Sequence, residues 1–372
     1  MTLPPAPTNT AVVLDAGDDA AFTHAALAAH APQAGRITLH PGPGTTSDTA
    51  LASDLLQSLG KPARIPGRYP HGRPPLWEAA AAWTTALAVT RLTVLRAHLL
   101  DRRRLQRLLD LQRQTGIHLT LVVHRPRLTA ALHRALTASH HTTVRTLAEA
   151  RALYLGDAVS PGPPPAAPDP PAPPVALRWI TIDALDRLVS YDSPQPCTAT
   201  CTPTPIVYHQ RPAPLPPTPA QSARLADRLH TATAHPARAA ALAAAIATGA
   251  SFQQLTTARA DGFHPADSTL TLHDRTRYTD GCAIYPVPPW AAVFLHAATR
   301  FAHLTSTPHL LAAPTDRPAL LRLAETIRLR PPQPPAGRAG ARRGPVVWDW
   351  REKHEALRHE PTHPARPTVS RR

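Results

Sequence analysis

Cysteine, lysine and long apolar runs are all scarce in this sequence of 372 residues. The scarcity of cysteine argues against a disulfide-stabilised fold, and the lack of long apolar runs argues against a membrane span. Cys197, Cys201 and Cys282 are too few for a disulfide framework, so we expect a reducing, cytoplasmic location. No apolar run approaches the roughly 18 residues that a membrane span needs, and the start of the chain has no signal-peptide pattern. We therefore expect a soluble protein with no membrane partner.

Positive charge is abundant, and it comes almost entirely from arginine. The chain has 40 basic and 25 acidic residues and a net charge of +15, and its only lysines are Lys61 and Lys353. A surface this positive attracts polyanions, of which nucleic acid is the commonest soluble example. A genome rich in G and C would also enrich arginine, alanine and proline. The charge alone therefore leaves DNA binding and compositional bias both open.

Proline divides the chain into regions of different character. Nine of the fourteen residues from 161 to 174 are proline, which predicts a semi-rigid linker because proline fixes φ and removes a hydrogen-bond donor. The predicted organisation is a domain at 1–158, a linker at 159–175, a short segment with a second proline-rich stretch at 176–219, a domain at 220–330 and a disordered basic tail at 331–372.

The first of these domains alternates strand-like and helix-like patterns. Short apolar strands are expected at 11–14, 36–39, 92–95 and 118–123, and helices at 20–29, 48–59, 77–89, 99–114 and 128–136. Strands that alternate with helices of this length predict an α/β domain whose parallel sheet is covered by helices on both faces.

The order of these elements, together with the segment Val94-Leu95-Arg96-Ala97-His98-Leu99-Leu100, resembles the AAA-type P-loop ATPases of the transposition-helper kind. In that family the corresponding strand ends in Asp-Glu-Ala-His-Leu-Leu. Leu95 and Arg96 stand here in place of the two carboxylates, which help to hold Mg²⁺ and activate water. The resemblance thus implies a P-loop-like fold that has lost its hydrolytic carboxylates.

The phosphate loop of that family is missing as well. Such a loop needs Gly-x-x-x-x-Gly-Lys-Ser/Thr, but the one Gly-Lys, at Gly60-Lys61, is followed by Pro62. The first strand is followed by Asp15-Ala16-Gly17-Asp18-Asp19, which places carboxylates where phosphates would lie. The resemblance therefore implies a pseudo-ATPase scaffold that needs no cofactor.

The second domain is predicted to be mainly helical with one small β-hairpin. Helices are expected at 220–229, 237–247, 252–258, 289–303 and 317–329, and the two hairpin strands at 269–272 and 283–287.

Residues 237–304 resemble part of the catalytic domain of the tyrosine recombinases, the phage integrases. That family has a helix ending Thr-Gly-x-Arg-x-x-Glu-Leu, a hairpin bearing a lysine and a Pro-Leu-Pro entry to the next helix. The corresponding segments are Thr248-Gly249-Ala250-Ser251-Phe252-Gln253-Gln254-Leu255 and Pro286-Val287-Pro288-Pro289.

The catalytic residues of the recombinases are not retained. Ser251 stands in place of the catalytic arginine and cannot clamp a phosphate through two hydrogen bonds. Arg275 or Arg277 lies near the position of the hairpin lysine and keeps its charge. The one downstream His-x-x-Arg, at 363–366, has no tyrosine after it. The resemblance implies a recombinase-like frame without strand cleavage.

The same segment has two other interpretations. Ala245, Gly249, Leu255 and Ala258 have the spacing of a helix-turn-helix core, or they simply pack two alanine-rich helices together. A recognition helix at this place would present glutamine, threonine and arginine side chains to the major groove. The candidate DNA-binding residues are Ser251, Gln253, Gln254, Thr257, Arg259, Arg275 and Arg277.

A metal site has little support in the sequence. Cys197 and Cys201, with His209 nearby, could supply three zinc ligands, but the Cys-x-x-x-Cys spacing is one residue longer than usual and no fourth ligand is evident. We therefore expect no bound metal, and we identify no catalytic residue.

Two hypotheses of function follow. The first is a non-catalytic DNA-binding accessory or regulatory protein, related to the proteins of recombination and mobile elements. The alternative is a protein–protein adaptor whose degenerate ATPase domain binds an active ATPase or recombinase and makes no direct contact with DNA. An enzyme of unrecognised type is a weaker third.

Overall fold

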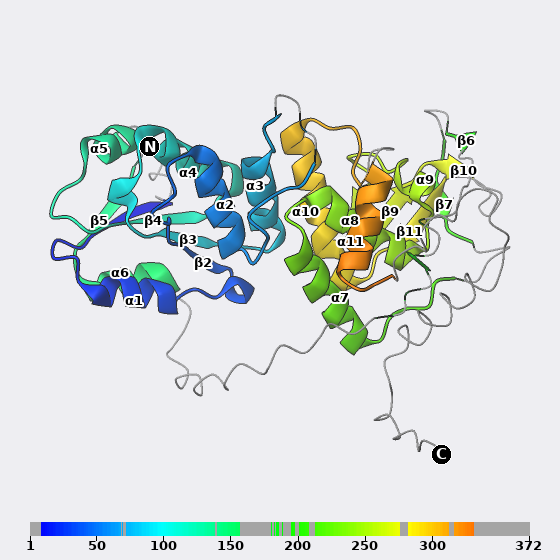
Figure 1. Ribbon diagram of the computed structural model, residues 1–372, viewed down its shortest axis with the longest axis horizontal. Coiled ribbons are helices and arrows are strands. Elements are labelled where there is room, and N and C mark those ends of the chain that lie inside the picture. Colours follow the sequence, from blue (N-terminus) through cyan, green and yellow to red (C-terminus); the bar gives the residue numbers. More distant parts are fainter. Residues whose placement is uncertain are drawn as a thin grey trace, which may run out of the picture. The chain divides into compact units, whose positions relative to one another are not determined.

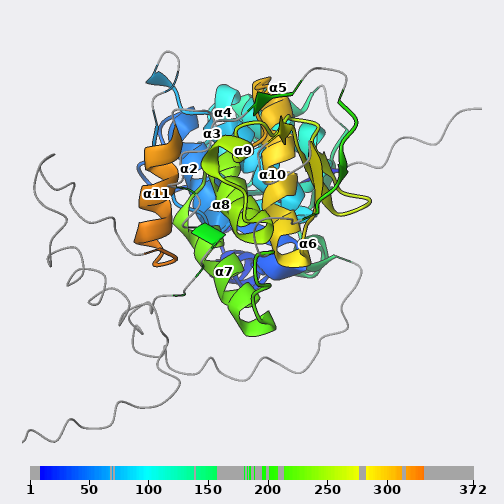
Figure 2. The same cartoon turned by 90° about the vertical axis from the view of Figure 1, so that its right-hand side faces the viewer.

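Figures 1 and 2 show two views of the computed structural model of the chain, which divides into two compact units. The first unit comprises residues 1–168, 233–237 and 296–307, and the second comprises residues 169–232, 238–295 and 308–372. The structure describes residues 9–156 except 68, 70, 71, 138 and 139, and then residues 180, 182, 184, 185, 188, 195–197, 201–207, 213–275, 282–311 and 316–330. The predicted linker at 159–175, the predicted tail at 331–372, His209 and Arg277 lie outside this part.

The first unit contains a five-stranded, entirely parallel sheet. Its strands are β1 (Thr10–Leu14), β2 (Arg36–Leu39), β3 (Arg91–Val94), β4 (His118–Val123) and β5 (Thr142–Val144), in the spatial order β2-β3-β4-β1-β5. Every residue of β1 is buried, as expected for a strand in the middle of a parallel sheet. The predicted α/β domain with a parallel sheet is confirmed.

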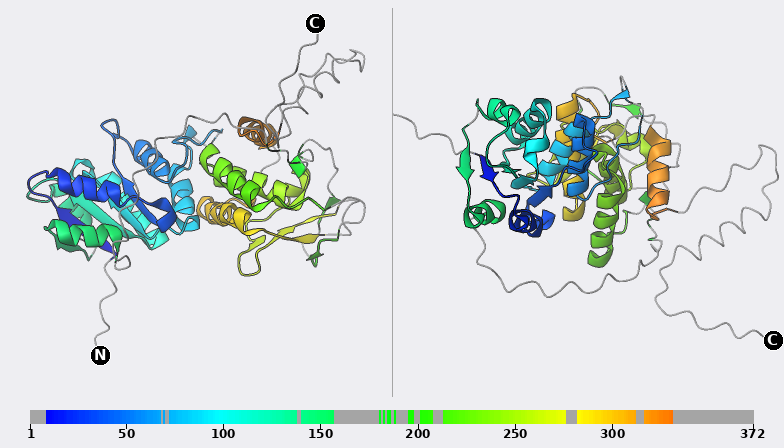
Figure 3. Two further views of the ribbon diagram at one scale, coloured as in Figure 1. Left: turned by 90° about the horizontal axis from the view of Figure 1, so that it is seen from below. Right: turned by 60° about the vertical axis from the view of Figure 1, so that its left-hand side comes forward.

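The helices between the strands form two groups. They are α1 (Ala20–Ala28), α2 (Asp48–Ser58), α3 (Leu76–Ala86), α4 (Arg102–Thr115), α5 (Ala130–Leu136) and α6 (Leu147–Leu155). Figure 3 (left) shows α1 and α6 side by side in front of the sheet, and these two helices contact each other. The helices α2, α3, α4 and α5 contact one another in sequence and make up the second group.

The observed elements of this unit differ from the predicted ones mainly beyond residue 136 and at the start of α4. The sequence pattern predicts neither β5 nor α6. It also starts α4 at residue 99, whereas Ala97–Leu99 form a separate 3-10 turn. The helix begins later because Asp101 is its N-cap, accepting a hydrogen bond from the backbone N–H of Arg104 at 2.8 Å.

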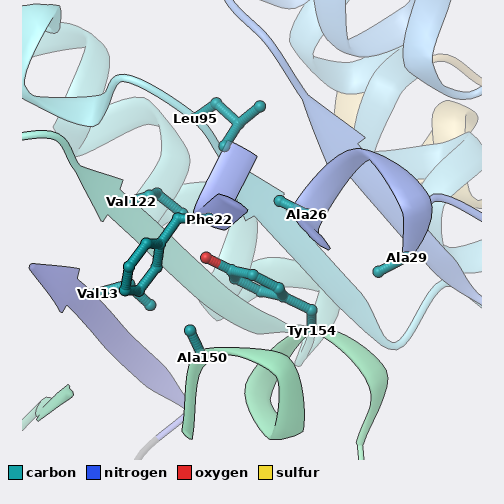
Figure 4. Close-up of a cluster of buried hydrophobic side chains, with 8 residues drawn as sticks. All are labelled: Val13, Phe22, Ala26, Ala29, Leu95, Val122, Ala150 and Tyr154. Carbon is teal, nitrogen blue, oxygen red and sulfur yellow. The ribbon is translucent and has the colours of Figure 1, made fainter. Parts of the chain in front are cut away.

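A compact apolar cluster fixes α1 and α6 to the sheet. Figure 4 shows its members, which come from β1, β4, both helices and the end of β3: Val13, Phe22, Ala26, Ala29, Leu95, Val122, Ala150 and Tyr154. The Tyr154 side chain is almost completely buried, and its hydroxyl oxygen has no hydrogen-bond partner among the described residues. Burial, followed by the charge of Asp15, raises the pKa of Tyr154.

The part of the chain from β6 to α11 combines helices with short strands. Its helices are α7 (Pro219–Ala232), α8 (Pro236–Thr248), α9 (Phe252–Leu255), α10 (Pro289–Thr305) and α11 (Arg317–Thr326), and the bounds of the two units fall inside α8 and α10. Its strands are β6 (Gln195–Pro196), β7 (Thr204–Pro205), β8 (Phe263–His264), β9 (Thr269–Leu272), β10 (Asp274–Arg275) and β11 (Ala283–Pro286).

The predicted hairpin is present as β9 and β11, which pair in an antiparallel register that sets Tyr285 opposite Leu270. It belongs to a four-stranded sheet of order β7-β11-β9-β8, which the sequence does not predict, and β10 pairs with β6 beside it. The helix expected at 252–258 ends at Leu255. Gly249 ends α8 with a φ of 62°, a left-handed conformation that glycine adopts without strain.

The buried Tyr154 hydroxyl yields a test of the packing around α6. We expect Tyr154→Phe to leave the free energy of unfolding unchanged or to raise it by up to about 1 kcal/mol, because the change removes an unpaired buried hydroxyl without opening a cavity. Tyr154→Ala should cost about 3–5 kcal/mol, since it empties the space that the ring fills. Urea unfolding of the two variants measures both values. A cost above about 1 kcal/mol for Tyr154→Phe would mean that the hydroxyl has a partner.

Candidate functional site

The carboxyl edge of the parallel sheet is where α/β domains of this type bind ligands. β1 and β4 are neighbours in the sheet, but the chain continues from them in opposite directions. After β1 it crosses towards β2 at one edge, and after β4 it crosses towards β5 at the other edge. Such a reversal opens a crevice beyond the strand ends. Two polar residues lie at this point: Asp15 directly follows β1, and His124 directly follows β4.

Asp15 and His124 form a buried pair. The strands run in register with Leu14 beside Val123, so the next residue of each strand also meets its neighbour. The Asp15 Oδ2 atom lies 2.8 Å from Nδ1 of His124, and both side chains are almost completely buried. Asp18, which is exposed to 56%, lies 3.2 Å from the same nitrogen through Oδ1. Two carboxylates therefore approach the same nitrogen of the imidazole.

Asp15 also contributes to the N-terminus of α1, together with Asp19. The Asp15 Oδ1 atom accepts a hydrogen bond from the backbone N–H of Asp19 at 3.0 Å. Asp19 is itself the N-cap of α1 and accepts from the N–H of Ala21 at 2.8 Å. Free N–H groups at a helix N-terminus attract phosphate. Here the chain's own carboxylates occupy two N–H groups at the helix start, those of Asp19 and Ala21.

The end of β3 carries Leu95 and Arg96, which lie in different environments. Leu95 is completely buried, and its N–H donates to the carbonyl of Leu39, so it belongs to the core. Arg96 adopts a left-handed conformation with a φ of 50°, and Asp18 does the same with a φ of 51°. Their side chains lie 3.9 Å apart in an ion pair. Two non-glycine residues in this sparsely populated region mark a locally strained edge.

His98 completes the polar edge. Its ring packs edge-on against His124, with 6.1 Å between the ring centroids. Burial, followed by the charges of Arg125, His124 and Arg96, lowers the pKa of His98, and Asp18 acts in the opposite direction. His98 Nδ1 and His124 Nε2 are buried atoms without a hydrogen-bond partner among the described residues.

A cleft of about 360 Å³ opens next to the pair. Its lining residues are Leu14, Asp15, Ala16, Gly17, Asp19, Phe22, Pro126 and Arg145. Arg145 is the one basic lining residue beside two carboxylates, which is a poor environment for a triphosphate. The ligand atoms of Asp15, Asp18 and His124 lie within 4.8 Å of one another and could share a cation, but Nδ1 of His124 already pairs with both carboxylates.

The predicted DNA-binding residues occupy different environments. Ser251 is completely buried as the N-cap of α9: its Oγ accepts from the N–H of Gln254 at 3.3 Å, and the Gln254 side chain accepts from the N–H of Ser251 at 3.0 Å. This reciprocal capping box occupies both side chains. Gln253 and Thr257 are half-buried, and Arg259 is exposed. Arg275 lies in β10.

Thr257 connects α9 to the hairpin. Its hydroxyl accepts a hydrogen bond from the backbone N–H of His273 at 3.0 Å and donates to the carbonyl of Gln254 at 2.7 Å. His273 stands between β9 and β10. Burial, followed by the charge of Arg259, lowers the pKa of His273, while Asp261 raises it.

All three cysteines of the chain meet His273 in the second unit. The ligand atoms of Cys197, Cys201, Cys282 and His273 lie within 4.8 Å of one another. The Cys201 sulfur is 3.3 Å from Nδ1 of His273. Burial, followed by hydrogen bonds with the other two thiols, raises the pKa of Cys282. Sequence reasoning considers Cys197 and Cys201 but misses His273 and Cys282, because strand pairing brings these distant residues together.

No protein-family model matches this chain, and no curated protein or solved structure is significantly similar to it. Among the described residues, none of the helices combines the length and the apolar character that crossing a bilayer requires.

The Asp15–His124 pair yields a test of how the sheet edge is held. Asp15→Ala removes the partner of a buried imidazole and the acceptor for the N–H of Asp19, so we expect it to lower the free energy of unfolding by about 2 kcal/mol or more. Asp18→Ala is the matched control, because it removes a mostly exposed carboxylate near the same nitrogen; it should cost less than about 1 kcal/mol. Chemical denaturation measures both. Equal costs would show that burial of Asp15 contributes nothing.

Proposed function

We propose that this protein is a non-catalytic DNA-binding accessory or regulatory protein, with a P-loop-like, doubly covered first domain that does not use nucleotide. The net charge of +15 carries the DNA-binding part of this proposal. Charge of this size attracts a polyanion over distances of the order of the Debye length, about 8–10 Å in physiological salt. The proposed partner is duplex DNA.

The first domain supports the non-catalytic part. Its strand order, with the cleft at the start of α1, is compatible with a P-loop-like domain. At that cleft Asp15 and Asp19 satisfy the helix N–H groups that would otherwise receive phosphate. A nucleotide would have to displace a buried carboxylate and approach a second one, and both steps are unfavourable. We therefore infer a scaffold role for this domain.

The proposed DNA contacts lie around α9 and the hairpin of the second unit. Arg259 is exposed at the end of the α9 region, and Arg275 follows the hairpin strand β9. Gln253 lies in α9, and Thr257 follows this helix two residues before Arg259. The buried Ser251 and Gln254 fix the start of α9, so their contribution is to hold the backbone that carries the contacts.

The scaffold role predicts no response to nucleotide. A ligand that binds only the folded state stabilises it by RT ln(1 + [L]/Kd), which is about 2.7 kcal/mol at one hundred times Kd. We expect about 1 mM ATP with Mg²⁺ to stabilise the protein by less than about 0.4 kcal/mol, the value for a Kd of about 1 mM. Differential scanning calorimetry with and without nucleotide measures this shift. A clear rise in Tm with Mg²⁺-ATP would contradict the proposal.

The DNA-binding role predicts salt-dependent binding to random duplex DNA. Each phosphate contact releases counterions and contributes about 0.9 to the slope of log K against log salt. If Arg259 and Arg275 both contact phosphate, the double variant Arg259→Ala/Arg275→Ala should lower this slope by about 1.8. Fluorescence anisotropy over a series of salt concentrations measures the slope.

A charge-matched control separates local contact from overall charge. Arg103→Ala/Arg113→Ala also removes two positive charges, but from α4 of the first unit, where these arginines pair with Asp48 and Asp110. This variant should leave the slope nearly unchanged. Equal effects of the two double variants would refute the assigned contact region. Absent binding at about 50 mM salt, or binding that does not vary with salt, would refute DNA binding itself.

A further inference from the structure

We propose that Cys197, Cys201, His273 and Cys282 bind one Zn²⁺ ion in a closed, tetrahedral, structural site. This inference is independent of DNA binding, since it rests on the geometry of the four side chains alone. It also replaces the ligand set considered from the sequence, in which His209 would have joined Cys197 and Cys201.

The spacing of the four ligand atoms fits the ion. Zinc binds thiolate sulfur at about 2.3 Å and imidazole nitrogen at about 2.0–2.1 Å, so ligand atoms at the corners of a tetrahedron lie about 3.5–3.8 Å apart. Here all of them lie within 4.8 Å of one another, and the Cys201 sulfur is 3.3 Å from Nδ1 of His273. Adjustment of the side-chain torsions would bring these atoms to the corners of the tetrahedron.

Two of the ligands are placed by the hairpin. The pairing of β9 with β11 sets Leu272 opposite Ala283. His273 is the residue after Leu272, and Cys282 is the residue before Ala283. The two ligands therefore extend from adjacent antiparallel strands at the same end of the ladder, where directly opposed residues lie close together.

The other two ligands are placed by the short strands. Pro196 of β6 pairs with Asp274 of β10, which brings Cys197 next to His273. Thr204 of β7 pairs with Ala283 of β11, and its N–H donates to the carbonyl of Cys282 at 3.1 Å. Cys201 lies three residues before Thr204, at the same end of the sheet. Three separate strand pairings thus converge on one point.

The donor set favours zinc over the alternatives. Three soft thiolates and one imidazole in a tetrahedral arrangement select Zn²⁺, and hard cations prefer oxygen ligands. Four protein ligands leave no open coordination position, so the ion would hold structure and activate no water. A disulfide would use two of the three thiols and give the third thiol and the imidazole no role.

The local structure needs such an ion. The strands β6 and β7 have two residues each and lie in a proline-rich part of the chain, so backbone pairing alone holds them weakly. A tetrahedral ion would tie both strands to the hairpin, and metal binding contributes directly to folding in sites of this kind. Because His273 also bonds Thr257, the ion would fix the hairpin against the α9 region.

Metal content of the purified full-length protein is the primary test. We expect inductively coupled plasma mass spectrometry to find one zinc per chain, and titration with a mercurial thiol reagent to release the zinc in step with modification of three thiols. Replacement of zinc by Co²⁺ should give the visible absorption of a tetrahedral thiolate site. The proposal would be overturned if the purified protein contained no zinc and, after reduction, bound none from added Zn²⁺. A Cys197–Cys201 disulfide would overturn it as well, and so would stoichiometric iron with visible absorption bands.

Three histidine variants test the ligand set. His273→Gln should lose most of the zinc and weaken the binding of Zn²⁺ in competition with a chelator. His264→Gln changes an exposed histidine in β8 of the same sheet, and His209→Gln changes the histidine considered from the sequence; both should retain one zinc. Retention by His273→Gln, or loss by His209→Gln, would refute the ligand set. If His273→Gln fails to fold, the zinc stoichiometry and thiol release of the unmodified chain decide the question.

Discussion

The first unit depends on how the ends of β1 and β4 are joined beyond the sheet. The two strands pair in parallel, but after their ends the chain continues in opposite directions, from β1 towards β2 and from β4 towards β5. Asp15 and His124 meet at this point and bury their polar atoms against each other. Because Asp15 also accepts the N–H of Asp19, the N-cap of α1, the same carboxylate links the end of β1 to the start of this helix. One buried side chain thus contacts both His124 and the helix start, and the strained residues Asp18 and Arg96 form an ion pair nearby.

The second unit solves a related problem by different means. It has strands too short to pair strongly, and their ends converge on four side chains that could not share an apolar core. Without a metal, the proximity of the thiols stabilises the fold little. A cation bound at the centre of the cluster would stabilise the folded state directly. Both units therefore place their chemistry at strand ends, where the backbone ladder stops and side chains must satisfy one another. The difference is that Asp15 and His124 already pair with each other, whereas the cysteine cluster would be completed by the proposed zinc ion.

Much of the secondary structure could be predicted from the sequence, because apolar periodicity is a local property. The strands β2, β4 and β9 begin and end where the pattern places them. The helix α6 begins at Thr146 with Glu149 three residues on, a capping box that the sequence already contains but that the periodicity of the helix obscures. Ser251 and Gln254, which the sequence predicts as DNA contacts, form a second capping box and are buried, and the sequence shows a polar side chain without showing its burial. The ligand set of Cys197, Cys201, His273 and Cys282 could not be predicted, since it is created by register between segments about 80 residues apart.

The two ends of the sheet edge, at β3 and at the start of α1, bear on the proposal that the first domain does not use nucleotide. On the proposed resemblance to ATPases, Leu95 stands where a catalytic carboxylate would lie, and its side chain enters the core and adds buried apolar area. Filling the start of α1 with Asp15 and Asp19 satisfies helix N–H groups that an unliganded phosphate loop leaves to water. Each change removes the need for a ligand to complete the site. On the proposed resemblance to ATPases, the domain is then complete without nucleotide, because its own side chains satisfy the polar groups that a bound phosphate would otherwise satisfy.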